Sequence, residues 1–169
     1  MNLSPKRAAE SATEMVQVVL PNDANPLGFI LGGTVMHLID IAGAIASVRH
    51  ARAAMVTAAV DGLQFLHPIK VGDLIILRAR VTAAWGTSLE VEVEVFSEET
   101  LTGVRRMTSR AYLTFVAVDR GGQRVTIPGL ILETEEDRRR AAEADGRRVD
   151  RLKAREALKE RLSLDLSKS

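Results

Sequence analysis

The stretch that decides the fold is residues 25–50, NPLGFILGGTVMHLIDIAGAIASVRH. Before its last two residues this stretch carries a single formal charge, that of Asp40, among apolar and small side chains. Gly32 and Gly33 interrupt the apolar pattern, Thr34 is a candidate N-terminal cap, and no proline follows. The stretch therefore predicts one buried helix that ends near residue 50 and is roughly 25 Å long.

The two faces of this predicted helix differ in size and polarity. At about 100° per residue, one face is small or polar and consists of Gly33, Met36, His37, Asp40, Gly43, Ala44 and Ser47. The opposite face is bulky and apolar and consists of Val35, Leu38, Ala42 and Ile45. The helix pattern alone leaves two interpretations of Asp40 open: a carboxylate satisfied by a neighbouring Thr, His or backbone N–H group, or a functional group.

A membrane span is the alternative interpretation of about twenty mostly apolar residues. A central carboxylate such as that of Asp40 would cost several kcal/mol in lipid, and the chain that follows resembles soluble strands. We therefore expect no membrane-spanning segment.

Strand-like segments surround the predicted helix, one before it and four after it. They are residues 14–21, 55–65, 74–84, 85–96 and 104–118. The clearest is LEVEVEV at 89–95, whose glutamates we expect to meet water or basic side chains on adjacent strands. Short connections favour antiparallel pairing. The sequence thus predicts an α+β fold in which an antiparallel sheet of about five strands wraps a long central helix.

Composition divides the chain into one domain and two flanking segments. The 169 residues are 46% hydrophobic, carry a net charge of +1 and contain no cysteine, which is typical of one domain with a real core. We expect the domain at residues 13–130, an N-terminal arm at 1–12, and a charged, helical or partly disordered tail at 131–169. A break at Asp145–Gly146 is predicted to divide the tail into two helical pieces.

Charge and targeting signals exclude several classes of function. The near-neutral charge gives no argument for nucleic acid, and the arginines of the tail alternate with acids and lack aromatic neighbours. No N-terminal apolar segment resembles a signal peptide, so we expect a cytoplasmic protein.

Common catalytic patterns are absent from the sequence. It has no GxSxG motif and no cysteine nucleophile, and its three histidines do not have metal-ligand spacing with acids, so we expect no metal site. His50 and His67 are expected at the surface or in turns. For His37 two interpretations stay open, a satisfied core residue or a residue that lines a substrate site.

Four sequence blocks in register resemble one known family. PNDANPLGFILGGTVMHLIDIAGAIASVRH, VTAAVDGLQFLHPIKVGD, GTSLEVEVEV and AYLTFVAVD are similar in sequence and spacing to the acyl-CoA thioester hydrolase family, over roughly residues 14–128. The resemblance implies a hotdog fold and hydrolysis of acyl-CoA to free acid and CoA, without a cofactor, at the interface of two hotdog units. Residue by residue, the family's helix carboxylate falls on Asp40, its loop asparagine on Asn25, and its glycine turn on Gly32 and Gly33.

Other residues fall in family-like strings with less definite roles. Thr57 and Ser88 either line the site or are structural, and Asp61 either shares such a role or begins a strand bend at Gly62. Family members often carry a basic residue just before a Thr-Ser pair, where this chain has Trp85-Gly86. By charge alone, the candidates for binding the CoA phosphates are Arg49, Arg52, Lys70 and Arg78. Arg49 could instead complement the C-terminus of the helix.

Thioester chemistry favours a site built from two chains. Hydrolysis needs a water nucleophile, a base, and donors aimed at the developing oxyanion. Asp40 can serve as base or as nucleophile, and the amides at Gly33 can serve as donors, but the two lie about 10 Å apart along one helix. Two antiparallel helices would bring Asp40 of one chain beside Gly33 and Asn25 of the other. Gly43 and Ala44 would leave space for the acyl chain.

We therefore expect a homodimer at minimum, and a trimer of dimers by analogy with the family. Three alternatives are a hydrolase of other acyl thioesters such as acyl carrier protein adducts, a non-catalytic acyl-CoA sensor, and a dehydratase. A sensor would be expected to carry a DNA-binding module, and neither terminus resembles a helix-turn-helix. A dehydratase is disfavoured because no family-like catalytic histidine accompanies the helix carboxylate.

Overall fold

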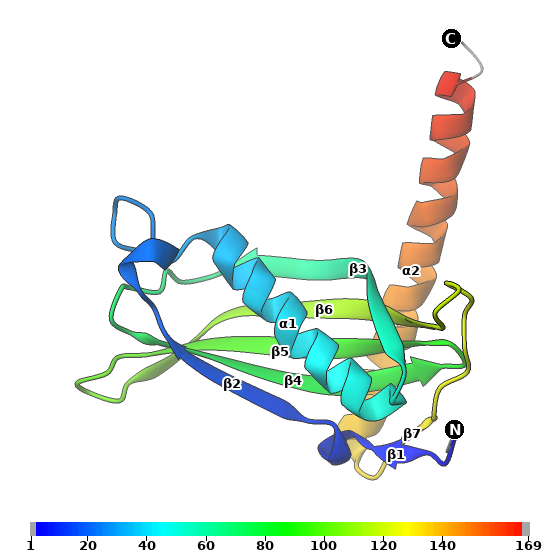
Figure 1. Ribbon diagram of the computed structural model, residues 1–169, viewed down its shortest axis with the longest axis horizontal. Helices are drawn as coiled ribbons and strands as arrows, with labels where there is room; N and C mark the ends of the chain where they lie inside the picture. Colours follow the sequence, from blue (N-terminus) through cyan, green and yellow to red (C-terminus); the bar gives the residue numbers. More distant parts are fainter. Residues whose placement is uncertain (1–2, 167–169) are drawn as a thin grey trace.

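A long helix lies across a five-stranded antiparallel sheet in the computed structural model, which describes residues 3–166 (Figure 1). The helix, α1, spans Gly32–Ala51. The sheet has the order β2-β4-β5-β6-β3, with β2 at Thr13–Val18, β3 at Ala54–Phe65, β4 at Leu74–Trp85, β5 at Ser88–Glu98 and β6 at Arg105–Val118. The predicted α+β hotdog architecture is confirmed, since each predicted strand segment overlaps one of these strands to within a few residues at either end.

The core lies between α1 and the inner face of the sheet. Val35, Leu38 and Ala42 are buried there, as the predicted bulky face requires. Gly43 is also buried, and a Cβ atom at this position would lie 3.0 Å from the ring of Phe115. Glycine at this position therefore lets the helix approach the sheet closely.

Three details of the predicted helix are wrong. Thr34 is not its cap, because α1 begins at Gly32 and its N-cap, Leu31, makes no side-chain capping bond. Gly43 and Ser47 do not belong to an open small face, because both are buried. The open side of α1 is narrower than predicted, since the buried contact with the sheet extends around the helix as far as these two residues.

Two short strands that flank the main sheet in the sequence pair with each other. β1 at Lys6–Arg7 pairs in parallel with β7 at Leu130–Ile131, and a short 3-10 helix follows at Ala8–Glu10. Lys6 Nζ donates a hydrogen bond of 2.7 Å to the carbonyl oxygen of His50 at the end of α1. The predicted arm is therefore tied to the sheet and helix, apart from residues 1 and 2, which lie outside the described residues.

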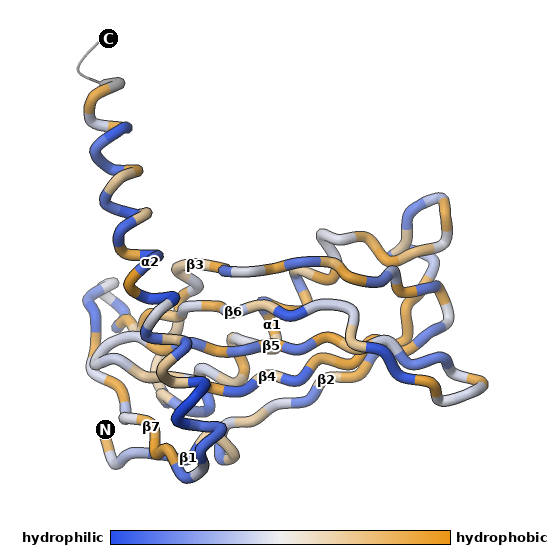
Figure 2. The backbone as a smooth tube through the Cα atoms, turned by 180° about the vertical axis from the view of Figure 1, so that it is seen from behind, coloured by the Kyte–Doolittle hydropathy of each residue, from blue (hydrophilic) through white to orange (hydrophobic). Residues whose placement is uncertain are grey.

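A second helix, α2 at Glu135–Leu166, crosses the outer face of the sheet and continues past edge strand β3 (Figure 2). The predicted break at Asp145–Gly146 is wrong, because the helix is continuous there. The side chains that flank Gly146 explain this: Asp145 accepts a hydrogen bond of 2.8 Å from Trp85 Nε1, and Arg147 binds Glu90. Residues 167–169 of the predicted tail lie outside the described residues. None of the described helices combines the length and apolar character needed to cross a bilayer.

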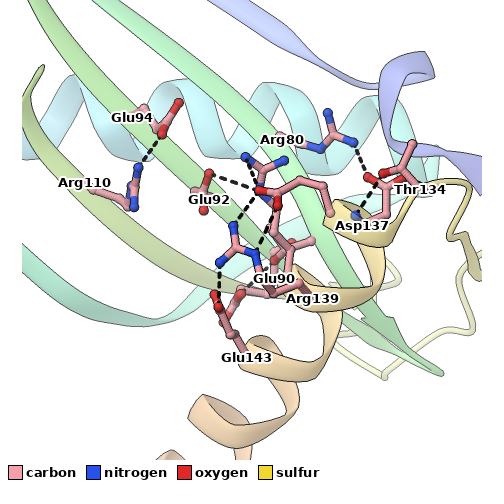
Figure 3. Close-up of polar contacts among 12 residues, drawn as sticks. Arg80, Glu90, Glu92, Glu94, Arg110, Thr134, Asp137, Arg139 and Glu143 are labelled. Atoms are coloured by element: carbon pink, nitrogen blue, oxygen red, sulfur yellow. Dashed lines mark hydrogen bonds and ion pairs between the residues drawn. The ribbon is translucent and has the colours of Figure 1, made fainter.

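Two glutamates of β5, Glu90 and Glu92, face α2 rather than open water. Glu94 pairs with Arg110 of β6 at 2.6 Å, as predicted for a basic neighbour (Figure 3). Glu90, however, is 0% exposed and accepts hydrogen bonds from Thr82 at 2.7 Å and Arg147 at 2.8 Å. A buried carboxylate is stable only when it is paired in this way. The alternating pattern located the strand but could not show that a helix more than fifty residues later covers its acidic face.

His50 is fully buried at the end of α1, so its predicted surface location is wrong. Its Nε2 lies 3.0 Å from the carbonyl oxygen of Pro128, which can only accept, so Nε2 carries the proton. Nδ1 is buried and has no partner among the described residues. Burial lowers the pKa of the imidazole, and the nearby charge of Lys6 adds to this, against the opposing effects of the Pro128 hydrogen bond and Glu10.

The neutral state of His50 predicts an acid-sensitive fold. The unfolded chain takes up this proton first as the pH falls, so the free energy of unfolding should decrease below about pH 6.5. His50→Gln keeps an N–H donor for Pro128 and removes the titration, so it should flatten this part of the pH dependence. Urea unfolding at about pH 7.5 and about pH 5.5 measures the effect, with exposed His67→Gln as the control. If the free energy of unfolding of His50→Gln falls between these two pH values as much as that of the wild type, His50 is not the group responsible for the acid sensitivity.

Candidate active site

Asp40 lies in the middle of α1, half-buried, with its carboxylate held by edge strand β3. Thr57 Oγ1 donates a hydrogen bond of 2.6 Å to Asp40 Oδ1. No group in the described part of the chain donates to the other carboxylate oxygen, Oδ2. The carboxylate therefore has one fixed oxygen and one oxygen available to a water molecule or a substrate.

A pocket of about 320 Å³ opens in front of this carboxylate. Its polar side chains are Asp40, Thr57 and His37, and its remaining lining is apolar: Met36, Ile39, Val60, Leu63 and Leu113. His37 is exposed and lines this pocket, so the structure favours the substrate-lining interpretation over the core one. A mostly apolar pocket with a few polar side chains suits a ligand with a reactive polar head and a hydrocarbon tail.

The side chain of Asn25 is oriented by its own loop. Its Oδ1 accepts hydrogen bonds from the backbone N–H groups of Leu27 at 3.0 Å and Phe29 at 3.1 Å. Because the oxygen is used twice in this way, the amide group Nδ2 points away from the loop backbone. Nδ2 has no acceptor among the described residues, and it remains available as a donor.

The start of α1 supplies further donors. The Leu31 N–H group donates to Asp23 O at 2.8 Å, and the first helical bond runs from Val35 N–H to Leu31 O at 3.1 Å. The N–H groups of residues 32, 33 and 34 have no acceptor within the range that the structure describes. Gly33 is exposed, and apart from its chain neighbours and the adjacent helix backbone no atom lies within 4 Å of the position that its Cβ would occupy. Free amides, an open approach and the positive end of the helix dipole together favour an anionic group at this point.

The donors and the carboxylate do not meet within one chain. Asn25 and Gly32 line a second pocket, also of about 320 Å³, which shares no residue with the pocket of Asp40. Asp40 and Gly33 are separated by about 10 Å of helix. A single chain thus carries both halves of the predicted site, but in different places.

Two other predicted site residues lie away from both pockets. Ser88 alternates with Glu90 along β5 and is paired with Trp85, so its side chain belongs to the outer face, opposite to α1. Arg49 lies near the C-terminal end of α1, where its guanidinium donates to Ala12 O and Thr13 Oγ1, both at 3.0 Å. Their predicted roles in substrate binding gain no support from contacts within one chain.

Three other basic residues were candidates for the CoA phosphates. Arg78 pairs with Glu14 at 2.7 Å, and Arg52 ends α1 in a left-handed conformation with φ of 52°. Lys70 is exposed in a small pocket that also holds Asp73, so its surroundings carry both signs of charge. Trp85 donates to Asp145 of α2 and thus belongs to the docking of that helix.

The sequence interpretation missed the contribution of Val60 to the pocket. Strict alternation from Thr57 would place Ala59 and Asp61 on its face of the sheet. A register shift between Thr57 and Ala59 instead turns Val60 inward, opposite Leu113, and Asp61 outward. No residue type in this stretch predicts the register shift.

Residues 27–104 match the family model of the thioesterase superfamily. A relative described as an uncharacterized acyl-CoA thioester hydrolase from Bacillus subtilis is 38% identical over 128 residues, or 76% of this chain and 74% of the relative. The chain belongs to the acyl-CoA thioester hydrolase family. It spans 39% of the length of the human cytosolic acyl coenzyme A thioester hydrolase, to which it is 30% identical.

Solved structures of the same class are closely similar. An apo-hexameric acyl-CoA thioesterase superimposes with a TM-score of 0.85 at 38% identity, over 89% of this chain and 97% of that one. An acyl-CoA hydrolase from Staphylococcus aureus, crystallised with butyryl coenzyme A and coenzyme A, gives a TM-score of 0.85 at 34% identity, over 96% and 98% of the two chains. That enzyme was also crystallised with an aspartate, an asparagine or a threonine replaced by alanine. Those three positions have the same mutual spacing along the chain as Asn25, Asp40 and Thr57 here.

Proposed function

We propose that this protein hydrolyses acyl-CoA thioesters to a free carboxylic acid and CoA. The observation that carries the proposal is the Asp40 carboxylate, held on one oxygen by Thr57 and facing an apolar pocket with the other. The family assignment supports the substrate class, and the matching spacing of Asn25, Asp40 and Thr57 supports the choice of residues.

In the proposed mechanism Asp40 acts as general base. It takes a proton from a water molecule, and the water oxygen attacks the thioester carbonyl carbon to give a tetrahedral oxyanion. The N–H group of Gly33, at the positive end of the helix, and Asn25 Nδ2 donate to this oxyanion. Collapse of the intermediate breaks the C–S bond, and the departing CoA thiolate takes up a proton. Every group in this scheme comes from the chain, and no metal or cofactor takes part.

The proposed site forms between two chains. One chain holds its donors and its carboxylate in separate pockets, so an antiparallel partner helix is the simplest source of the missing half. β3 offers the surface for such pairing, because it is a twelve-residue edge strand with exposed apolar side chains at Val56 and Val60. Pairing two β3 strands would continue the sheet and bring the two α1 helices together. The structure of a hexameric relative supports further assembly into a trimer of dimers.

A coupled assay tests the proposed function. The protein is incubated with a series of acyl-CoA esters of increasing chain length, and a thiol reagent detects released CoA. We expect release with at least part of the series, and the rates give the preferred chain length. Calorimetric binding of the same esters without release of CoA would instead assign a non-catalytic acyl-CoA sensor. If the protein hydrolyses acyl carrier protein adducts but no acyl-CoA ester, its substrates are acyl thioesters of the carrier protein and not of CoA.

A further inference from the structure

Helix α2 follows a single row of side chains across the outer face of the sheet. The row consists of one residue from each of four neighbouring strands, which the register places side by side: Arg80, Glu92, Tyr112 and Asp61. Figure 2 shows α2 crossing these strands before it extends beyond β3. The helix thus connects the sheet from β4 to its far edge.

Each member of this row has its own partner on α2. Arg80 pairs with Asp137, whose backbone N–H group also donates a hydrogen bond of 3.0 Å to Thr134 Oγ1 (Figure 3). Further along, Arg140 lies 3.7 Å from Glu92, and the guanidinium of Arg147 lies 3.6 Å from the ring centre of Tyr112. The last contact reaches the edge strand itself, where Arg151 Nη1 lies 2.8 Å from Asp61 Oδ2.

The part of β3 that receives this last contact is irregular. Register shifts occur between Thr57 and Ala59 and again between Asp61 and Gln64, and Gly62 has a φ of +65°. Within one chain β3 pairs with β6 alone, and the proposed dimer would add backbone pairing along its other side, where the two register shifts interrupt the regular spacing of hydrogen-bonding groups. Thr57, which holds the Asp40 carboxylate, immediately precedes the first shift. The position of the Thr57 hydroxyl therefore depends on how firmly this segment is held.

We propose that Arg151 is a positioning residue for the hydrolysis, acting through Asp61 and the irregular segment of β3 on the hydrogen bond from Thr57 to Asp40. The inference rests on the proposed role of Asp40 as base. Arg151 holds the outer side of the segment, while Val60 and Leu63 line the Asp40 pocket on its inner side. Helix α2 is thus part of the active-site support and not a separate tail.

A different result is expected if Arg151 has only a structural role. The Arg151 side chain is 15% exposed and that of Asp61 is 29% exposed, so the pair is mostly buried, and its loss is expected to lower stability whichever role it has. If Arg151 acts only by attaching α2, its loss should lower the resistance to urea and leave kcat per folded molecule unchanged. If it positions Thr57, kcat should fall although the protein stays folded.

The experiment compares Arg151→Met, which keeps much of the aliphatic stem, with Arg138→Met as a matched control. Arg138 forms an exposed ion pair with Glu135 on the same helix, far from β3. We expect Arg151→Met to lower kcat by roughly tenfold with KM little changed, Arg138→Met to match wild type, and Arg151→Lys to recover part of the loss. In a Thr57→Val background, Arg151→Met should have almost no further effect, because the two residues act in series. Wild-type kcat in Arg151→Met, or full additivity with Thr57→Val, would overturn the proposal.

A second readout separates this proposal from the proposed function. Amide hydrogen exchange of residues 57–63 should be faster in Arg151→Met than in Arg138→Met, while exchange in β4 and β5 should be unchanged. This result is expected whatever ester the wild-type protein hydrolyses. If the wild-type protein releases CoA from no ester, the proposed function fails. If exchange at 57–63 is the same in both variants, the positioning role of Arg151 fails.

Discussion

Replacing Asp40 with asparagine is expected to lower kcat for acyl-CoA hydrolysis by at least about a hundredfold, a typical magnitude for loss of a general base. Asparagine keeps the size of the side chain and an oxygen that can accept the hydrogen bond from Thr57, but it cannot take a proton from water. The effect should therefore appear in kcat, with little change in KM or in the urea midpoint.

The matched control is Asp150→Asn on an exposed turn of α2. This variant makes the same chemical change away from both pockets and should keep the wild-type rate. Full activity in Asp40→Asn would show that the Asp40 carboxylate is not the general base. Its role would then be limited to the hydrogen bond with Thr57.

Replacing Asn25 with aspartate should have an effect of similar size for a different reason. The new carboxylate still accepts from the N–H groups of Leu27 and Phe29, so the loop should keep its conformation. It loses the Nδ2 donor and places a negative charge where the oxyanion develops. Loss of one such donor typically costs about a hundredfold to a thousandfold in kcat.

The control for this change is Asn22→Asp, an exposed position three residues earlier. It introduces the same charge near the loop and should leave kcat within about twofold of wild type, because partly screened surface charges act weakly at this distance. If both variants lose activity equally, the charge near the loop is responsible, and the Nδ2 group is not a donor to the oxyanion.

The local pattern of the sequence was sufficient for the central helix and the five strands of the sheet, and it singled out Asp40, whereas Asn25 was chosen from the resemblance to the family. A long apolar segment with one charge requires a helix that buries most of its surface, and the alternation at residues 89–95 requires a strand with two unlike faces. Asp40 is conspicuous because an ionised carboxylate in apolar surroundings needs a hydrogen-bond or ion-pair partner, or is retained for a functional role. The structure supplies the partner, Thr57, which was one of the predicted site residues.

The errors share a physical cause, which is contact between segments that are distant in sequence. His50 was assigned to the surface, but Pro128, seventy-eight residues later, accepts its hydrogen bond in the core. The break at Asp145–Gly146 was expected from local helix propensity, which the contacts of neighbouring residues with the sheet outweigh. Such contacts leave no periodic signal in either segment.

The central claim is that each site combines Asp40 of one chain with Asn25 of another, and subunit mixing tests it most directly. Asp40→Asn and Asn25→Asp chains are unfolded together in equal amounts, refolded, and assayed beside each variant refolded alone. In a mixed dimer one site carries both defects and the other carries neither, so random pairing should restore about a quarter of wild-type activity. If Asp40 and Asn25 act within the same chain, every site keeps one defect, and the mixture should be as inactive as its parents. That result would contradict the account.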